Sequence, residues 1–531
     1  RSVDYRTDIW SLGVCFYEML TGELPFTGDA DAAIIYSILN NDSQPASEIR
    51  PDISPAINRI LSKMMAKNPD DRYQTIPELI AHLEAPESAA FIDASGTPAR
   101  RDKTMPSIAV LPFEDMSPNK DQEYFCDGIA EEIMNALNQL EGLRVAARTS
   151  AFAFKNKTEN VREIGRKLNV GTLLEGGVRK AGNKLRITVQ MTDAVEGYRL
   201  WSGRFDRELK DVFAIQEEIA ANVVDALEIE LGETEDHPLT KAATEDHQAY
   251  DLYLRGRQFY RQTYRKGINY AIEMFENAIK KDPNYALAYA GLADCYSYLF
   301  SFFDSNRANL DNAMTLSQRS LELDPKLAEA HVARGRAFYH GTRYKEAEQE
   351  FETAIRLNPR LFTAYDSYAR NCYSQGDLVK AAKLFEKAIS IDPADFDTPL
   401  LLAQTYRGLN QNEPVKEYLE RGLANVKRHL ELNPDDARAI YMRAIGLAVS
   451  GEKKEAWKWI ERAQSIDPED PMIMYGAACV FALTGREEEA LTQLEKALSA
   501  GCCHKNWVEM DSDFDALRDH PRFKELMSRL E

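Results

Sequence analysis

An Asp-Pro or Asn-Pro pair that recurs along the second half of the chain constrains the fold more than any other sequence feature. Successive prolines of these pairs are 42, 34, 34, 41 and 34 residues apart. Proline ends a helix because it lacks an N–H donor and clashes with the preceding turn. A near-constant period with a helix stop in every unit predicts stacked helical hairpins, each burying its apolar face against the next. The prolines are Pro283, Pro325, Pro359, Pro393, Pro434 and Pro468.

Small and aromatic residues hold matching places within these units. Ala347, Phe351 and Ala354 precede Pro359 by the same steps as Ala381, Phe385 and Ala388 precede Pro393. Small residues let paired helices pack closely, and the phenylalanine fills the gap between neighbouring units. The pattern resembles the tetratricopeptide repeat, with about seven hairpins over residues 248–503. Residues 504–531, which carry apolar residues at helical spacing, are predicted to form a capping helix.

A stack of such hairpins has a concave face, and the resemblance implies that this face binds proteins or peptides. Arg336, Tyr339, Arg370 and Tyr373 fall at positions that line this face, and arginine and tyrosine are typical binding residues. We therefore predict them to be groove residues. Tyrosine is also a normal core residue at the adjacent position, so packing is the alternative role for the two tyrosines.

Residues 105–232 alternate between short apolar runs and amphipathic stretches, which predicts a small α/β domain. Expected strands cover residues 107–113, 143–147, 171–179, 184–193 and 199–205, and expected helices cover 128–140, 161–168 and 212–231. Ala181–Asn183 has the composition of a hairpin turn. The segments EYFCDGIAEE at 123–132 and LWSGRFDRELKDVF at 200–213 resemble the TolB-type amino-terminal domain. This resemblance does not imply a catalytic activity for the domain.

Three features that could suggest chemistry have structural interpretations. Gly171, Gly176, Gly177 and Gly182 lack a following Gly-Lys-Ser/Thr, so they predict turns and a bulge rather than a phosphate loop. Asp127, Glu131 and Glu132 are interpreted as acids at a solvated helix start. Cys502, Cys503 and His504 are too close together for a structural zinc site and have no second ligand pair, so no metal is expected.

Residues 1–85 contain the most specific segments of the chain. VDYRTDIWSLGV at 3–14, YEMLTGELPF at 17–26 and KNPDDRYQT at 67–75 resemble the C-terminal lobe of bacterial eukaryotic-type Ser/Thr protein kinases. The resemblance implies structural roles for Asp8, Trp10, Gly13 and Arg72. Asp8 would accept N–H bonds from the catalytic loop, and Arg72 would pair with the glutamate of an Ala-Pro-Glu segment.

The remaining kinase motifs do not occur in this sequence. It has no Gly-rich loop over phosphates, no Val-Ala-Ile-Lys, no His-Arg-Asp and no Asp-Phe-Gly. We expect the chain to bind no cofactor itself and to be inactive as a kinase, with ATP and magnesium implied for an intact parent. Because the expected partners of Asp8 and Arg72 are missing, residues 1–85 are predicted to be the least stable part.

Charge and hydropathy narrow the possible partners. Acidic residues outnumber basic ones 85 to 65, and the net charge is −20. The acidity is spread along the chain, so a nucleic-acid partner is not expected. No apolar run approaches the roughly 20 residues that cross a bilayer, and the seven cysteines form no disulfide pattern. A cytoplasmic protein without membrane contact is predicted.

These features combine into a multidomain, mainly α chain. A helical kinase-lobe fragment at 1–85, a linker at 86–104, an α/β domain at 105–232 and a linker at 233–247 precede the repeat solenoid. The predicted function is that of a fragment of a Ser/Thr protein kinase whose α/β and repeat domains recruit or sense partners. The alternative is a non-catalytic tetratricopeptide scaffold or signalling adaptor.

Overall fold

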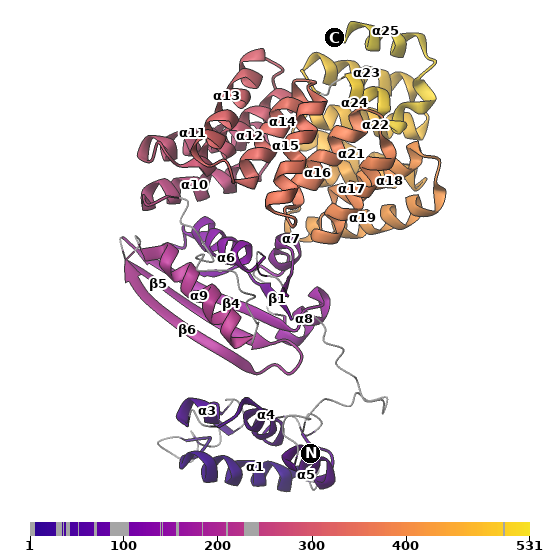
Figure 1. Ribbon diagram of the computed structural model, residues 1–531. Helices are drawn as coiled ribbons and strands as arrows, with labels where there is room; N and C mark the ends of the chain where they lie inside the picture. Colours follow the sequence, from indigo (N-terminus) through magenta and orange to yellow (C-terminus); the bar gives the residue numbers. More distant parts are fainter. Residues whose placement is uncertain are drawn as a thin grey trace. The chain divides into compact units, whose positions relative to one another are not determined.

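The computed structural model divides the chain into two compact units, Arg1–Thr104 and Met105–Glu531 (Figure 1). The structure describes residues 6–27, 34, 37–38, 43–50, 53–67, 69, 72–84, 106–138, 140, 142–155, 159–182, 184–208, 211–227, 244–502 and 505–530. The 86–104 linker, most of the 233–247 linker, Cys503 and His504 lie outside these residues.

The first unit is helical, as its sequence period predicts. Its helices are α1 (Arg6–Thr21), α3 (Ala46–Ile49), α4 (Pro55–Met64) and α5 (Ile76–Glu84). Helix α1 packs on α4, and the expected helix near residues 30–39 lies mainly outside the described residues. Trp10 stacks on Phe26 with ring centroids 5.8 Å apart. The residues of the sequence motifs thus form the small core of this unit.

Gly13 is the point of closest approach between α1 and α4. A Cβ atom added there would lie 2.8 Å from Cβ of Met64 and 2.9 Å from Cγ of Met65. Only glycine leaves room for the side chains of Met64 and Met65 at this distance. Close packing is therefore the physical reason for the glycine in the DIWSLG segment.

We predict that Gly13→Ala destabilises the first unit by about 1–3 kcal/mol, because the added methyl group overpacks the helix crossing. Ser11→Ala is the matched control, since Ser11 is exposed on the same helix. Hydrogen exchange of the α1 and α4 amides in the full chain measures both effects. Equal exchange in the two variants would contradict the packing role.

The environments of Asp8 and Arg72 in the structure differ from those that the kinase resemblance implies. Asp8 is exposed in the first turn of α1, where a negative charge is favourable next to the helix N-terminus. Arg72 is half-buried, and its guanidinium donates to the carbonyl oxygens of Ala66, Arg6 and Lys67 at 2.8, 3.1 and 3.3 Å. Arg72 therefore joins the start of α1 to the end of α4.

The α/β domain contains a mixed sheet with the strand order β3-β1-β4-β5-β6, and β2 pairs with β4. Strands β1, β2 and β3 are parallel to their neighbours, whereas β4, β5 and β6 form an antiparallel meander. The strands are β1 (Ser107–Val110), β2 (Glu114–Asp115), β3 (Arg144–Val145), β4 (Thr172–Ala181), β5 (Lys184–Asp193) and β6 (Arg199–Glu208). The predicted hairpin turn is present, with Gly182 at φ +58°.

The other glycines of this domain lie inside a strand. Gly176 and Gly177 pair in regular register with Val189 and Thr188, and the irregularity of the sheet falls at Met191/Thr192. A Cβ atom on Gly176 would lie 2.8 Å from the ring of Phe113. The prediction of a bulge at these glycines is therefore wrong, and the glycine leaves space for an aromatic ring that crosses the strand.

The helices of this domain connect the sheet to the repeats (Figure 1). They are α6 (Glu123–Asn138), α7 (Arg148–Phe152), α8 (Val161–Leu168) and α9 (Val212–Ala226). Helices α6 and α9 pack on each other and on the sheet, and α6 also contacts α10 (His247–Tyr260), the first repeat helix. Tyr250 of α10 packs edge-on against Phe213 at 4.7 Å, and its hydroxyl accepts from Gln216 at 2.9 Å.

One hydrophobic core runs from β1 into the third repeat helix, from Ile108 to Phe303. Gly128 of α6 permits this continuity, because a Cβ atom there would lie 2.6 Å from a methyl carbon of Leu254. The α/β domain and the first repeats are therefore packed as one body.

Fourteen helices of residues 244–502 form seven antiparallel pairs. The further helices are α11 (Arg265–Lys281), α12 (Ala286–Phe302), α13 (Arg307–Leu323), α14 (Ala328–His340), α15 (Tyr344–Leu357), α16 (Phe362–Ser374), α17 (Leu378–Ile391), α18 (Asp397–Gly408), α19 (Asn412–Leu432), α20 (Ala437–Val449), α21 (Lys453–Ile466), α22 (Pro471–Thr484) and α23 (Glu487–Ser499). Phe351 and Phe385 are fully buried, and Gly335 packs directly against the Phe351 ring. The array is the α-helical solenoid that the period predicts.

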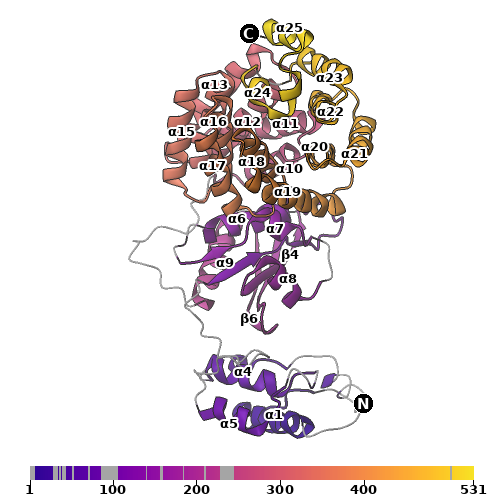
Figure 2. The ribbon, with the colours of Figure 1, turned by 90° about the vertical axis from the view of Figure 1, so that its right-hand side faces the viewer.

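The C-terminal segment differs from the expected single capping helix. It forms α24 (Lys505–Met510), a 3-10 turn (Ser512–Leu517) and α25 (Pro521–Arg529). Helix α24 returns to α16, and the 3-10 turn contacts α18 and α22 (Figure 2). The segment covers the last hairpin with Phe523 and Leu526, and it also closes part of the inner face of the solenoid.

Candidate functional site: a chamber between the α/β domain and the repeats

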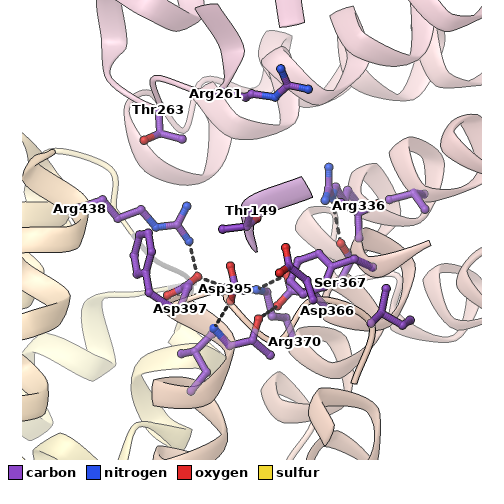
Figure 3. Close-up of a pocket in the computed structure, with 18 of the residues that line it drawn as sticks. Thr149, Arg261, Thr263, Arg336, Asp366, Ser367, Arg370, Asp395, Asp397 and Arg438 are labelled. Carbon is purple, nitrogen blue, oxygen red and sulfur yellow. Dashed lines mark hydrogen bonds and ion pairs between the residues drawn. The ribbon is translucent and has the colours of Figure 1, made fainter. Parts of the chain in front are cut away.

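A cavity of about 1030 Å³ lies between α6 and α7 of the α/β domain and the inner helices of the repeats. Figure 3 shows part of its wall, with Arg261 and Thr263 on one side, Asp395, Asp397 and Arg370 on the other, and Thr149 between them. The wall combines aromatic rings, hydroxyl groups and many charged side chains. A lining of this kind can bind a polar ligand with several directed contacts.

Residues from both parts hold the chamber together. Arg360, in the turn before α16, donates to the carbonyl oxygen of Leu143 at 2.8 Å. On the α6 side, Asp251 of α10 lies 2.5 Å from Nζ of Lys180 and accepts from the hydroxyl of Tyr124 at 2.8 Å. The α/β domain therefore forms a fixed wall of the chamber.

One corner of the chamber gathers arginines around a buried carboxylate. Glu131 of α6 is 7% exposed and pairs with Arg148 of α7 at 3.2 Å, with Arg257 of α10 and with Arg261, which directly follows α10. These guanidinium groups hold the pKa of Glu131 well below its usual range against the effect of burial. Burial, and then repulsion from Arg148 and Arg257, lower the pKa of Arg261 to about 10. Burial raises the pKa of the neighbouring Glu132 to about 7. The corner thus carries an excess of positive charge, and we call it the arginine corner.

A second corner, formed by α16, α18, α20 and the turn before α18, has an excess of carboxylates. Asp366 pairs with Arg370 at 2.9 Å, Arg370 reaches Asp397 at 2.6 Å, and Arg438 also pairs with Asp397. Asp395 accepts from the N–H of Thr398 at 2.7 Å and has no ion pair among the described residues. We call this group the aspartate corner.

Burial and mutual repulsion disfavour the ionised form of Asp395 in the aspartate corner. Burial first, and then the like charges of Asp397 and Asp392, raise the pKa of Asp395 to about 7. The two arginines keep the pKa of Asp397 below its usual value despite burial. Asp392 lies against α7 and accepts a hydrogen bond from the side chain of Thr149, and burial raises its pKa.

We predict that Asp395→Asn stabilises the protein above neutral pH by roughly 2–4 kcal/mol. In the wild type, the Asp395 carboxyl ionises near pH 4 in the unfolded state but only near pH 7 in the folded state. The loss of folding stability therefore grows between these two pH values and is constant above them. Asparagine keeps an acceptor for the Thr398 N–H. Thermal unfolding from pH 4 to 8 should show a gain that grows with pH. Asp435→Asn, at an exposed carboxylate, should change little, and a uniform gain at all pH values would contradict the assignment.

Three of the four predicted groove residues line the chamber. Arg336 lies 3.0 Å from Oδ1 of Asp294 and donates to Oγ of Ser367 at 2.9 Å. The hydroxyl of Tyr339 hydrogen-bonds Oγ of Ser374 at 2.9 Å, and Arg370 belongs to the aspartate corner. Whether any of them binds a partner stays a prediction.

Tyr373 does not line the chamber. It is 2% exposed, its hydroxyl donates to the carbonyl oxygen of Met510 at 3.0 Å, and its ring lies 4.9 Å from that of Trp507. The prediction of Tyr373 as a groove residue is wrong, because the returning C-terminal segment covers this position. The alternative role in packing describes it correctly.

The arginine corner contradicts one sequence interpretation. Asp127, Glu131 and Glu132 lie in the middle of α6, because the helix begins at Glu123 rather than at Gly128. Asp127 pairs with Lys155 at 2.7 Å and Glu131 is buried, so these acids are not a solvated helix start. The available signal was a run of acids within an otherwise apolar helix, and its arginine partners lie 17 to 130 residues away.

A buried trio of possible metal ligands lies at the other end of the inner face. The ligand atoms of Cys479, Asp511 and Asp513 lie within 4.8 Å of one another. Asp511 accepts from Tyr475 at 2.6 Å and from Gln404 at 2.5 Å, and Asp513 pairs with Arg407 at 2.5 Å. These carboxylates are already occupied by protein donors, so the trio acts as the anchor of the C-terminal segment.

Four family models match parts of the chain. Residues 1–83 match the protein kinase domain, and residues 103–240 match the second domain of HilA/YgeH-like transcriptional regulators. Residues 308–362, 332–396 and 373–428 match tetratricopeptide repeats. The chain therefore contains a kinase-domain fragment, a HilA/YgeH-like second domain and tetratricopeptide repeats. The TolB-type assignment expected for the α/β domain is not supported by these matches.

Curated relatives match in pieces. Putative adenylate cyclase 3 of Rhizobium meliloti is 38% identical over 245 residues, which are 46% of this chain and 42% of that protein. The serine/threonine-protein kinase PknB of Mycolicibacterium smegmatis is 45% identical over 83 residues, which are 16% of this chain and 13% of that protein. The chain thus spans less than half the length of these relatives.

Solved structures give weaker likenesses. A crystal structure of YrrB, titled as a tetratricopeptide protein with an unusual peptide-binding site, is 22% identical and covers 36% of this chain and 96% of its own, with a TM-score of 0.24. The human IFIT1 dimer with m7Gppp-AAAA is 13% identical and covers 60% and 70%, with a TM-score of 0.39. Within the described residues, no helix is both long and apolar enough to cross a bilayer.

Proposed function

We propose that this chain is part of a bacterial Ser/Thr protein kinase in which the α/β domain and the repeats recognise protein or peptide partners. The observation that carries the proposal is the match of residues 1–83 to the kinase domain. The same chain contains a second unit with a large cavity suited to ligand binding. The intact kinase would use ATP and magnesium to phosphorylate protein hydroxyl groups in the cytosol. This chain binds neither, because the phosphate and metal motifs are not in its sequence.

The second unit is the recognition part of this proposal. The match to a putative adenylate cyclase covers 245 residues, which is more than the 104 residues of the first unit, so it must include much of the second. Residues 103–240 of this unit also match a domain of transcriptional regulators, and a unit similar to parts of such different proteins is better suited to recognition than to catalysis. The net charge of −20 favours proteins or peptides over nucleic acid as partners.

A scaffold without catalysis is the second candidate, favoured by the absence of the catalytic motifs from this sequence. Phosphoryl transfer distinguishes the two. The purified chain, incubated with ATP, magnesium and a generic basic protein, should transfer no phosphate. A longer protein from the same gene should transfer phosphate and should carry His-Arg-Asp and Asp-Phe-Gly. A longer protein that lacks these motifs and is inactive would establish the scaffold instead.

A further inference from the structure

The two charged corners of the chamber have opposite net charge. At the arginine corner, three guanidinium groups share Glu131, and Glu132 has a pKa near neutrality. At the aspartate corner, Asp366 and Asp397 share Arg370 and Arg438, whereas Asp392 and Asp395 have no ion pair among the described residues. Each corner therefore has unbalanced charge inside a partly desolvated cavity, where unbalanced charge is costly.

The wall of the chamber also contains a buried hydroxyl group that has no hydrogen-bond partner in the part of the chain that the structure describes. Ser297 of α12 lines the chamber, is 1% exposed, and its hydroxyl has no hydrogen-bond partner among the described residues. Buried hydroxyl groups are almost always satisfied, so an unsatisfied one in a cavity wall is suited to a bound molecule.

We propose that the chamber binds a short free peptide as a zwitterion, with its carboxylate at the arginine corner and its ammonium group at the aspartate corner. This inference rests on the proposed function, in which the repeats recognise peptides, and it names the chemical class of the ligand. Each end of such a peptide neutralises the excess charge that faces it, and the hydroxyl groups of Thr149 and Ser297 are available to its backbone.

Size and geometry select a free peptide over a segment of a folded protein. Ligand pockets usually measure roughly 300–1000 Å³, and the chamber lies at the upper limit of that range. An extended peptide of three to five residues spans roughly 10–18 Å. Both of its charged ends must lie inside one cavity that the α/β domain walls on one side (Figure 3). A segment within a longer chain has no free ends to place there.

The test compares three pools of random tri- to pentapeptides with the full chain: peptides with free ends, the same peptides N-acetylated, and the same peptides C-amidated. Native mass spectrometry measures the bound fraction. For the wild type, we expect blocking either end to weaken binding at least tenfold. For Asp395→Asn, we expect free and N-acetylated pools to bind equally, while amidation still weakens binding. Asp435→Asn should behave as the wild type does.

The outcomes separate this inference from the proposed function. If all three pools bind the wild type equally well, peptide recognition stands and the assignment of the two corners fails. If no pool binds, this inference fails, and the proposed function is decided by the phosphoryl-transfer test above. Arg261→Gln should make free and amidated pools equivalent. Because that variant removes a Glu131 partner and disturbs the fold, the Asp395→Asn result decides the proposal, since its side chain keeps the same shape and acceptor.

Discussion

Replacing Glu131 with glutamine should destabilise the second unit by about 3–5 kcal/mol, because it leaves three half-buried guanidinium groups without their shared, buried anion. The α6–α10 contact should loosen first, since Glu131 joins the two helices. Hydrogen exchange of α6 and α10 in the full chain, together with thermal unfolding, measures the effect. Glu163→Gln is the matched control, because Glu163 is exposed and its pair with Lys167 is worth little.

The effect of Glu131→Gln should depend on pH in a defined direction. The arginines hold the pKa of Glu131 well below the unfolded value of about 4.3, so the stability it contributes is fully present above that pH. As the pH falls further, the unfolded carboxyl takes up a proton that the folded one resists, and the contribution declines. The difference between wild type and variant should therefore shrink below about pH 4. A difference that stays constant to pH 2 would contradict the ionised, paired state of Glu131.

Ending the chain at Cys503 should lower the melting temperature by ten degrees or more and reduce the soluble yield. The deletion removes the buried side chains of Phe514, Leu517, Phe523 and Leu526, each worth roughly 1.5–3 kcal/mol on burial. It also exposes Tyr373 and the inner faces of α18 and α22, which the returning segment covers. The exposed apolar surface promotes association.

A point variant keeps this prediction testable if the truncated chain cannot be purified. Phe514→Ala should cost about 3–5 kcal/mol, because Phe514 is fully buried between Tyr475 and Phe523. Lys524→Ala is the control at an exposed position of α25. Exchange in α16 should also quicken in the truncated chain. A truncated protein with unchanged solubility and melting temperature would refute the structural role of the segment.

The repeats and the strands could be predicted because their signals are local. The 34-residue period, the helix-ending prolines and the hairpin turn at Gly182 act on neighbouring residues, so sequence spacing is enough to find them. Gly13 was identified by resemblance, and the structure adds the close approach of α4 as its physical reason.

The chamber could not be predicted, because it depends on contacts between distant residues. Glu131 meets Arg257 across 126 positions, and Asp511 meets Gln404 across 107. No sequence period predicts such pairs. Without knowledge of its partners, an acidic residue in a predicted helix is interpreted as a surface residue. Tyr373 was misassigned for the same reason, since the segment that covers it follows more than 130 residues later.

The shared core between β1 and the third repeat helix sets where this protein can be divided and recombined. Residues 233–247 look like a linker, but a cut there would separate Tyr250 from Phe213 and Gln216 and expose both surfaces. The first compact unit ends at Thr104 and the second begins at Met105. Gene fusions that retain a folded second unit should therefore join before Met105, and the α/β domain and the repeats should be inherited together.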